Sequence, residues 1–247
     1  MEREQAVKFM QDLLKLMIEK KGSDLFITVD FPPAMKVQGK MTPVSKTPLT
    51  AENTKAMVYA VMNDRQLKEY EATKECNFAV APRGIGRFRA NAFIQQGYCG
   101  LVMRVIETEV PNLDKLGLPE VLKEIVMVKN GLVIMVGGTG SGKSTSLAAM
   151  IDYRNQNSYG HIITIEDPIE YVHPHKNCVL MQREVGVDTD DWEIALKNTL
   201  RQAPDVILLG EIRDKDTMEF GIAFAETGHL AMATLHANNS NQALDRI

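Results

Sequence analysis

A glycine-rich segment near the middle of the chain combines residue types that bind phosphate. Residues 137–144 read GGTGSGKS and fit the pattern G-x-x-x-x-G-K-[ST] at every fixed position. Glycines let backbone N–H groups wrap around a phosphate, Lys143 supplies a full positive charge, and the Ser144 hydroxyl can bind Mg²⁺. A glycine-rich turn without a ligand is the weaker alternative, because an apolar strand is expected before the segment and a helix after it. We therefore expect nucleotide phosphates and Mg²⁺ to bind at Gly137, Gly138, Thr139, Gly140, Ser141, Gly142, Lys143 and Ser144.

Two acidic segments follow predicted strands, where they could act on a bound phosphate. Glu166, Asp167 and Glu170 end the first strand, and carboxylates placed there can polarise water for attack on a γ-phosphate. Taken alone, Glu-Asp-Pro is also a common turn. Glu211 follows the hydrophobic run 206–209 and could hold Mg²⁺ directly or through water. A solvated glutamate at a strand end is the weaker alternative for Glu211.

Histidines occur in two places with different expectations. His229 and His236 bracket the predicted strand 230–235, and a neutral imidazole there could donate a hydrogen bond to a phosphate or a carboxylate. A structural role is equally open for each. His173, His175 and Cys178 lie within six positions but lack a fourth ligand nearby, so a surface loop is favoured over a zinc site.

Arginines in the first half of the chain are further candidates for phosphate contacts. Arg83, Arg87 and Arg89 lie in a glycine-punctuated segment, and the spacing of the last two puts both guanidiniums on one face of a strand. Arginines that reach into an active site stabilise phosphoryl-transfer charge. A surface ion pair is the alternative for each of them, and for Arg183 and Arg201 in the second half.

The elements that must position these residues alternate between strand and helix. Helices are expected over 143–155, 191–203 and 215–226, and apolar strands over 132–136, 161–165, 179–182, 206–209 and 230–235. This alternation predicts an α/β domain with a parallel sheet covered on both faces.

The preceding residues predict a smaller α+β domain. Helices are expected over 7–17, ended by Gly22, and over 50–62 with Thr50 as N-cap, and strands over 25–29, 35–37, 77–81, 86–94 and 101–106. The predicted division is a first domain 1–106, a proline-containing linker 107–119 and a second domain 120–247.

Composition limits the class of protein. The 247 residues carry 28 Lys+Arg against 32 Asp+Glu, a net charge of −4, and are 45% hydrophobic, which is typical of a soluble globular protein and argues against disorder. The longest apolar runs are far too short to span a membrane, and the charged N-terminus does not resemble a signal peptide. Three cysteines without paired spacing suit a reducing compartment, and the mild acidity gives no sign of a nucleic-acid surface.

Taken together, these segments resemble a known family. Residues 137–145, 166–170, 210–214 and 227–236 look like the Walker A motif, Asp box, Walker B motif and His box of the type II/IV secretion ATPases. Residues 22–25, 32–33 and 86–89 resemble the type IV pilus retraction ATPases. Residues 23–28, 201–205 and 236–239, which include Asn238 and Asn239, are more similar to the PilU branch of that family than to its PilT branch.

The resemblance implies a cytoplasmic hexameric ring, peripheral at the inner membrane, that hydrolyses ATP with Mg²⁺ to drive pilus retraction. Its subunit would join a PAS-like N-terminal domain to a RecA-like P-loop ATPase domain, with ATP between them. The pilus platform protein and a second retraction ATPase would be its partners, and the family continues beyond residue 247. The matching residues imply that Glu170 is the catalytic base, that Glu211 with Ser144 binds Mg²⁺, that Lys143, Thr145, Arg83, Arg87 and Arg89 contact the nucleotide, and that His229 and His236 form the His-box pair.

Other functions stay open at this point. An accessory ring subunit could bind nucleotide but depend on a partner ATPase. Pilus-assembly and type II secretion ATPases share the motifs, although they usually carry a much longer region before the P-loop. A nucleic-acid-dependent RecA-like ATPase is disfavoured by the net charge of −4 and the 6% aromatic content.

Overall fold

Alternating apolar residues build a six-stranded antiparallel sheet in the first unit of the structure, a computed structural model that describes residues 2–106, 109–237 and 240–245. Along its central strands every second side chain is buried, so Phe88, Ala90 and Ala92 face the core while Arg87 and Arg89 share the other face. The strand order is β3-β2-β1-β6-β5-β4, formed by β1 (Gly22–Ile27), β2 (Ala34–Val37), β3 (Lys40–Pro43), β4 (Glu75–Val80), β5 (Arg87–Gln95) and β6 (Tyr98–Ile106).

Three helices accompany this sheet: α1 (Arg3–Glu19), α2 (Ala51–Ala60) and α3 (Asp64–Thr73). Thr50 caps α2 as predicted, because its side chain accepts a hydrogen bond from the backbone N–H of Asn53. The predicted end of the first helix was wrong. The helix stops at Glu19, and Gly22 begins β1 instead of ending the helix. The sequence analysis missed α3 and β3. The short β3 is exposed at every position and so carries no apolar alternation.

The second unit contains a five-stranded sheet in which every pair of neighbours is parallel. The order β7-β11-β10-β8-β9 arises from β7 (Gly131–Gly137), β8 (Gly160–Glu166), β9 (Cys178–Glu184), β10 (Val206–Ile212) and β11 (Leu230–His236). This confirms the predicted α/β class with a parallel sheet.

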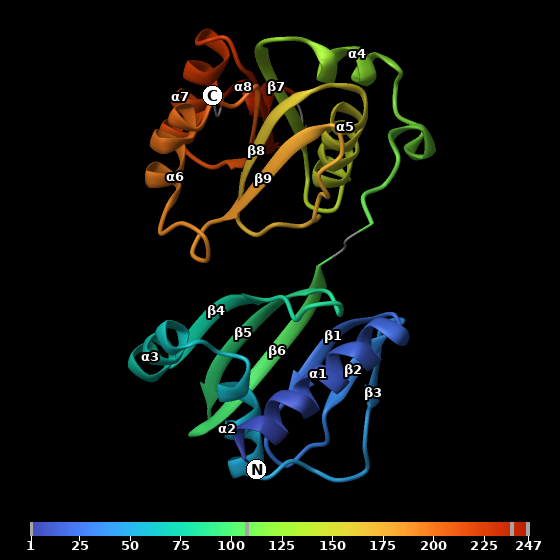
Figure 1. Cartoon of the computed structure of the whole chain (residues 1–247), viewed down its shortest axis with the longest axis vertical. Coiled ribbons are helices and arrows are strands. Elements are labelled where there is room, and N and C mark those ends of the chain that lie inside the picture. The colour runs from blue at the N-terminus through green and yellow to red at the C-terminus, as the bar shows by residue number, and fades with distance from the viewer. Residues whose placement is uncertain (1, 107–108, 238–239, 246–247) are drawn as a thin grey trace. The chain divides into compact units, whose positions relative to one another are not determined.

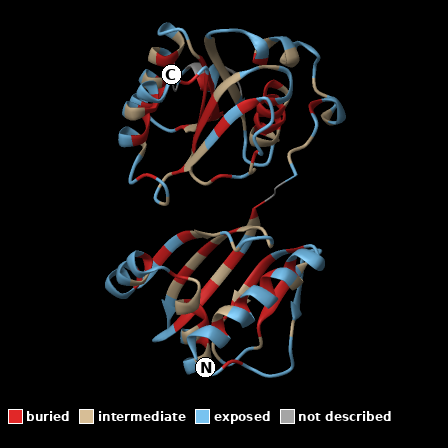
Figure 2. Cartoon of the chain, viewed as in Figure 1, coloured by how far each residue is buried: buried red, intermediate tan, exposed pale blue. Residues whose placement is uncertain are grey.

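Helices cover both faces of the parallel sheet. One apolar cluster joins the sheet to α4 (Val121–Met127) and α5 (Lys143–Asn157), and another joins it to α6 (Trp192–Thr199) and α7 (Lys215–Glu226). Figure 1 shows α5 and the α6–α7 pair on opposite sides of the strands, and Figure 2 shows buried residues both in the strands and along α5. The short helix α8 (Ser240–Leu244) follows β11, and Ala243 packs into the α6–α7 cluster.

Two predicted boundaries differ from the structure. Of the predicted linker 107–119, residues 107 and 108 lie outside the described residues, and Leu113 is buried with α4 and α5 in the second unit. It begins the 3₁₀ turn η1 (Leu113–Leu116), which an extended linker would not contain. The predicted helix 191–203 divides into α6 and the 3₁₀ turn η2 (Leu200–Gln202), which ends at Ala203 with a φ of 51°.

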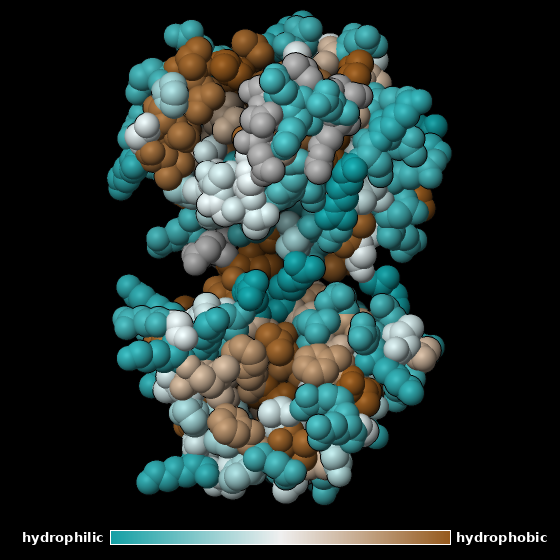
Figure 3. All heavy atoms as spheres, turned by 180° about the vertical axis from the view of Figure 1, so that it is seen from behind, coloured by the Kyte–Doolittle hydropathy of each residue, from teal (hydrophilic) through white to brown (hydrophobic). Residues whose placement is uncertain are grey.

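Some apolar surface stays exposed. From behind, Figure 3 shows brown apolar side chains gathered on part of the second unit. Within the described ranges, no helix has both the length and the apolar character that crossing a membrane requires.

Candidate active site

The phosphate-binding loop connects β7 to α5, as the spacing of its glycines predicts. Gly140 and Gly142 have φ values of 76° and 91°, a region that side chains with a Cβ rarely enter. The Lys143 ammonium donates to the carbonyl oxygens of Gly137 and Gly138, each at 2.9 Å. Lys143 therefore lies buried across the loop and holds its shape before any phosphate is bound.

Parallel pairing separates the two histidines that were predicted to act together. His236 is the register partner of Gly137, at the carboxyl edge of the sheet where the loop begins. His229 precedes β11 at the opposite edge, with Nδ1 3.0 Å from Thr227 Oγ1. Seven strand residues separate the edges by roughly 20 Å. The structure thus brings His236 to the loop and leaves His229 away from it. Asn238 and Asn239 lie outside the described residues.

A cavity of about 350 Å³ opens at the carboxyl edge of the strands. It unites the loop with both acidic segments, which are distant in sequence. Its described lining consists of Thr139, Gly140, Gly142, Lys143, Ser144, Thr145, Leu147, Ala148, Glu166, Asp167, Pro168, Glu170, Tyr171, His173, Leu208, Gly210, Glu211, Thr234 and His236. The predicted residues Glu170, Glu211 and Lys143 therefore share one cavity.

Glu211 is placed by a close approach of two strands. β10 and β8 meet at Gly210, where an added Cβ would lie 3.0 Å from Glu166 Cα. The Gly210 carbonyl accepts a hydrogen bond from Thr234 Oγ1 at 2.5 Å. Beyond it the Glu211 carboxylate lies 3.4 Å from His236 Nε2. The glycine brings the Glu211 carboxylate and the acidic segment 166–170 to the same edge.

Glu166 and Glu170, four residues apart, have different surroundings. The Glu166 carboxylate accepts hydrogen bonds from Thr164 Oγ1 at 2.6 Å and from Gln182 Nε2 at 3.2 Å. Burial, reinforced by the negative charge of Glu170, raises the pKa of Glu166 to about 7 although these hydrogen bonds lower it. Glu170 is exposed at the cavity. Glu170 is therefore the one of the two carboxylates that water can reach from the cavity.

Arg213 joins the two acidic segments, and the sequence analysis did not single it out. Its guanidinium donates to Asp167 Oδ2 at 2.9 Å through one terminal nitrogen and to Glu211 Oε2 at 3.1 Å through Nε. Partial burial opposes the charge, but these carboxylates raise the pKa of Arg213 above its ordinary value. The guanidinium also lies 5.8 Å from the centre of the Trp192 ring. The sequence signal that could have identified Arg213 is its position two residues after Glu211, because residues two apart along a strand lie on the same face.

The loop between β8 and β9 is exposed at residues 174–177, as expected for a surface loop, but the first and last members of the His-Cys segment are buried. His173 is buried and lines the cavity, and its Nδ1 has no hydrogen-bond partner. Burial lowers the pKa of His173 to about 4, so the ring is neutral at physiological pH. His175 Nδ1 accepts from the backbone of Leu180 at 3.1 Å, and Cys178 is buried. Among the described residues, no three His, Cys, Asp or Glu side chains form a metal cluster.

The tyrosine after the Asp box is another residue that sequence reasoning missed. The Tyr171 hydroxyl lies 3.1 Å from the Oγ1 atom of Thr145, and Thr145 is the residue that directly follows the glycine-rich loop. The Tyr171 carbonyl accepts from Gln182 Nε2 at 2.8 Å, and Gln182 also contacts Glu166. This chain of contacts links the first turn of α5 to the acidic segment.

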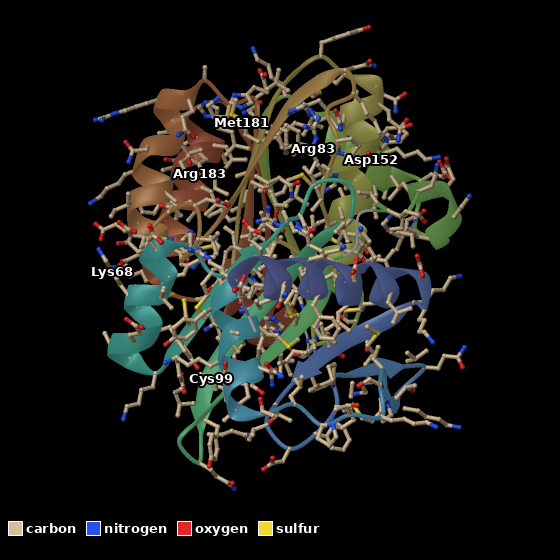
Figure 4. The ribbon with its side chains drawn as sticks, turned by 60° about the horizontal axis from the view of Figure 1, so that its bottom comes forward. Lys68, Arg83, Cys99, Asp152, Met181 and Arg183 are labelled. Carbon is tan, nitrogen blue, oxygen red and sulfur yellow. The ribbon has the colours of Figure 1, made fainter. Side chains whose placement is uncertain are left out.

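The predicted arginines belong to the first unit and are absent from the described lining of the cavity. Arg83 is exposed in the connection between β4 and β5, and Arg87 and Arg89 are partly buried on β5. Figure 4 labels Arg83 and also Arg183, which donates to the Asp188 carbonyl at 3.2 Å.

The oxygen atoms around the loop fit Mg²⁺ better than a softer metal. The Ser144 hydroxyl and the Glu211 carboxylate line the same cavity, and hard oxygen ligands suit this ion. Mg²⁺ with nucleotide phosphates needs only one or two protein oxygens, which agrees with the lack of a larger cluster among the described residues.

Comparison with known proteins gives consistent matches. The model of the family described as type II/IV secretion system protein matches residues 2–247. The Pseudomonas aeruginosa type IV pilus ATPase PilU is 62% identical over 96% of this chain and 62% of its own length. The type IV pilus retraction ATPase PilT of the same organism is 43% identical over 96% of this chain and 69% of its own length. The crystal structure of the pilus retraction motor PilT with bound ADP matches with a TM-score of 0.90 at 44% identity, over 96% of this chain and 69% of that one. This chain thus spans about three fifths of the PilU relative.

Gly210→Ala is expected to lower the free energy of unfolding by about 1–3 kcal/mol, because the new Cβ meets backbone atoms that cannot rotate away. Urea denaturation measures the change. Gly221→Ala in α7 is the matched control, since its Cβ would meet Leu132 Cδ1 at an ordinary 3.5 Å. Equal stability of the Gly210 variant and the wild type would contradict the close approach.

Glu166→Gln is expected to remove part of the pH dependence of stability. The unfolded glutamate loses its proton near pH 4.5, whereas the folded one keeps it to about pH 7. The folded wild type binds more protons in this window, so it loses stability as pH rises through it, by about 1–3 kcal/mol relative to the variant. Denaturation at several pH values measures the difference. Parallel pH profiles would show that the carboxyl is not held neutral.

Proposed function

Because this chain belongs to the type II/IV secretion system protein family, we propose that it is an ATP-hydrolysing motor subunit that powers type IV pilus retraction. The observation that carries the proposal is the single cavity that gathers Lys143, Glu170 and Glu211 from three separate segments. The high identity to PilU and PilT supports the pilus system in particular.

Each residue has a role that follows from its chemistry. Lys143 neutralises the β- and γ-phosphates of ATP. Glu170, exposed at the cavity, orients and deprotonates the attacking water. Ser144 and Glu211 hold Mg²⁺, which supplies charge stabilisation for the departing phosphate oxygens. His236 donates a hydrogen bond at the Glu211 carboxylate or the γ-phosphate.

The wider assembly is also part of the proposal. The working form is a homohexameric ring on the cytoplasmic side of the inner membrane, where it acts on the pilus platform protein together with a second retraction ATPase. Arg83, Arg87 and Arg89 contact the nucleotide phosphates in that ring. His229 lies away from the cavity of its own subunit, so its proposed role in the His-box pair requires contact with another subunit or another part of the site.

Lys143→Ala and Glu170→Gln are expected to abolish most ATP hydrolysis. Loss of the P-loop charge should cost at least about 100-fold in kcat, and loss of the base about 100- to 10,000-fold. Phosphate release with Mg²⁺–ATP measures both. Lys215→Ala is the matched control, because its side chain is 83% exposed and pairs only with Glu219 on the described surface of α7. Rates equal to wild type in both site variants would overturn the proposed mechanism.

The ring is expected to form in the presence of nucleotide. Mass measurement in solution with Mg²⁺–ADP should give six copies, and a strict monomer would contradict arginine contacts supplied by another subunit.

The same preparation separates a motor from an accessory subunit. ATP hydrolysis by this protein alone supports the motor, whereas activity that arises only after a PilT-type ATPase is added supports the accessory role.

A further inference from the structure

Both oxygens of the Glu211 carboxylate have partners within the chain. Oε2 accepts a hydrogen bond from Arg213 Nε at 3.1 Å, and Oε1 lies 3.4 Å from His236 Nε2. The arginine reaches Asp167 with its other nitrogens, at 2.9 Å to the carboxylate and 3.4 Å to the carbonyl oxygen. One guanidinium thus bridges the end of β10 and the Asp box.

This bridge conflicts with a cation at Glu211. Mg²⁺ binds oxygen at about 2.0–2.1 Å and demands near-octahedral geometry, directly or through its water shell. An arginine on the same carboxylate competes for the lone pairs and repels the ion. The contacts to Asp167 involve different guanidinium nitrogens, so Arg213 can lose one partner and keep the other.

We propose that Arg213 is a positioning residue that holds Glu211 and Asp167 together in the nucleotide-free site and releases Glu211, while keeping Asp167, when Mg²⁺–nucleotide binds. This inference rests on the proposed function. It gives the chain a contact that changes with the nucleotide state and connects the Walker B strand to the Asp box.

The side chains around Arg213 suit such a change. A planar guanidinium can reach two carboxylates at once, which the single ammonium of lysine does less well. The Arg213 side chain is 42% exposed, so it can move without opening the core. Beneath it lies Trp192, at the start of α6, with the guanidinium 5.8 Å from the ring centre.

Trp192 is the sole tryptophan of the 247 residues and therefore reports on Arg213 directly. Addition of Mg²⁺–ADP to the wild type is expected to change the intensity or wavelength of tryptophan emission. In Arg213→Gln the change should be lost, while equilibrium dialysis still shows bound ADP. Trp192→Phe has no tryptophan and gives the background emission. Lys215→Gln, which removes a neighbouring exposed charge, should show the same emission change as the wild type.

A second measurement tests the competition for Glu211. At a constant ADP concentration, the Mg²⁺ concentration that gives half-maximal ADP binding is expected to be about two- to fivefold lower in Arg213→Gln than in the wild type. A change of this size is what the loss of one partly exposed ion pair would produce. Arg213→Lys keeps the charge and should lie closer to the wild type. Dialysis with labelled ADP measures the binding without reference to hydrolysis.

The outcomes separate this inference from the function on which it rests. If ADP binds with Mg²⁺ but wild-type Trp192 emission does not change, Arg213 does not move and the inference fails alone. An unchanged Mg²⁺ requirement in a folded Arg213→Gln would likewise assign the residue a purely structural role. Should ADP not bind at all, the proposed function and the inference both fall. The wild-type emission test stays decisive even if the variant does not fold.

Discussion

Parallel pairing of β7, β11, β10 and β8 is the constraint on which the site depends. Parallel strands put their carboxyl ends at the same edge, so the loop after β7, Glu166 after β8 and Glu211 on β10 meet although about 75 residues separate the first from the last. The strands approach closely at Gly210, where an added Cβ would lie 3.0 Å from Glu166 Cα and would force the neighbouring backbone to shift. The same constraint divides His229 from His236, because one strand cannot present both of its ends to one edge.

The charged groups of Lys143 and Arg213 are paired within the site. Lys143 bonds the carbonyls of its own loop, and Arg213 bonds the two acidic segments. An unpaired buried donor or acceptor would cost about 1–3 kcal/mol, so these contacts stabilise the geometry of the site. Under the proposed function, phosphate and Mg²⁺ would compete with these internal partners. The contacts that stabilise the site are therefore the ones on which nucleotide binding would act.

The sequence predicts the parts of this site well and their arrangement less well. The loop, both acidic segments and the strand–helix alternation are local patterns, and the structure contains them. Strand order is not local, so the order β7-β11-β10-β8-β9 could not be found by reading neighbouring residues. The placement of His229 and His236 at opposite edges does follow from the sequence, because the two residues bracket one strand. Burial of His173 and the bridge made by Arg213 also depend on chain segments brought together by folding. The exposed strand β3 was missed because it carries no apolar alternation. The helix α3 was missed because it is polar overall and its buried residues are Gln66 and Tyr70, which do not form an apolar stripe.

The described lining of the cavity carries more negative than positive side chains, so binding a nucleotide there requires additional positive charge. Among its described lining residues, Lys143 faces the carboxylates of Glu166, Asp167, Glu170 and Glu211. The raised pKa of Glu166 and the bridging Arg213 reduce the imbalance, but a nucleoside triphosphate adds negative charge that Mg²⁺ only partly cancels. Transferring the γ-phosphoryl group spreads further charge over its oxygens, which arginines are suited to neutralise. Arg87 and Arg89, aligned on one face of β5 and opposite the core, have the chemistry that this deficit calls for. A positively charged group from outside the described lining would reduce the charge imbalance of the cavity.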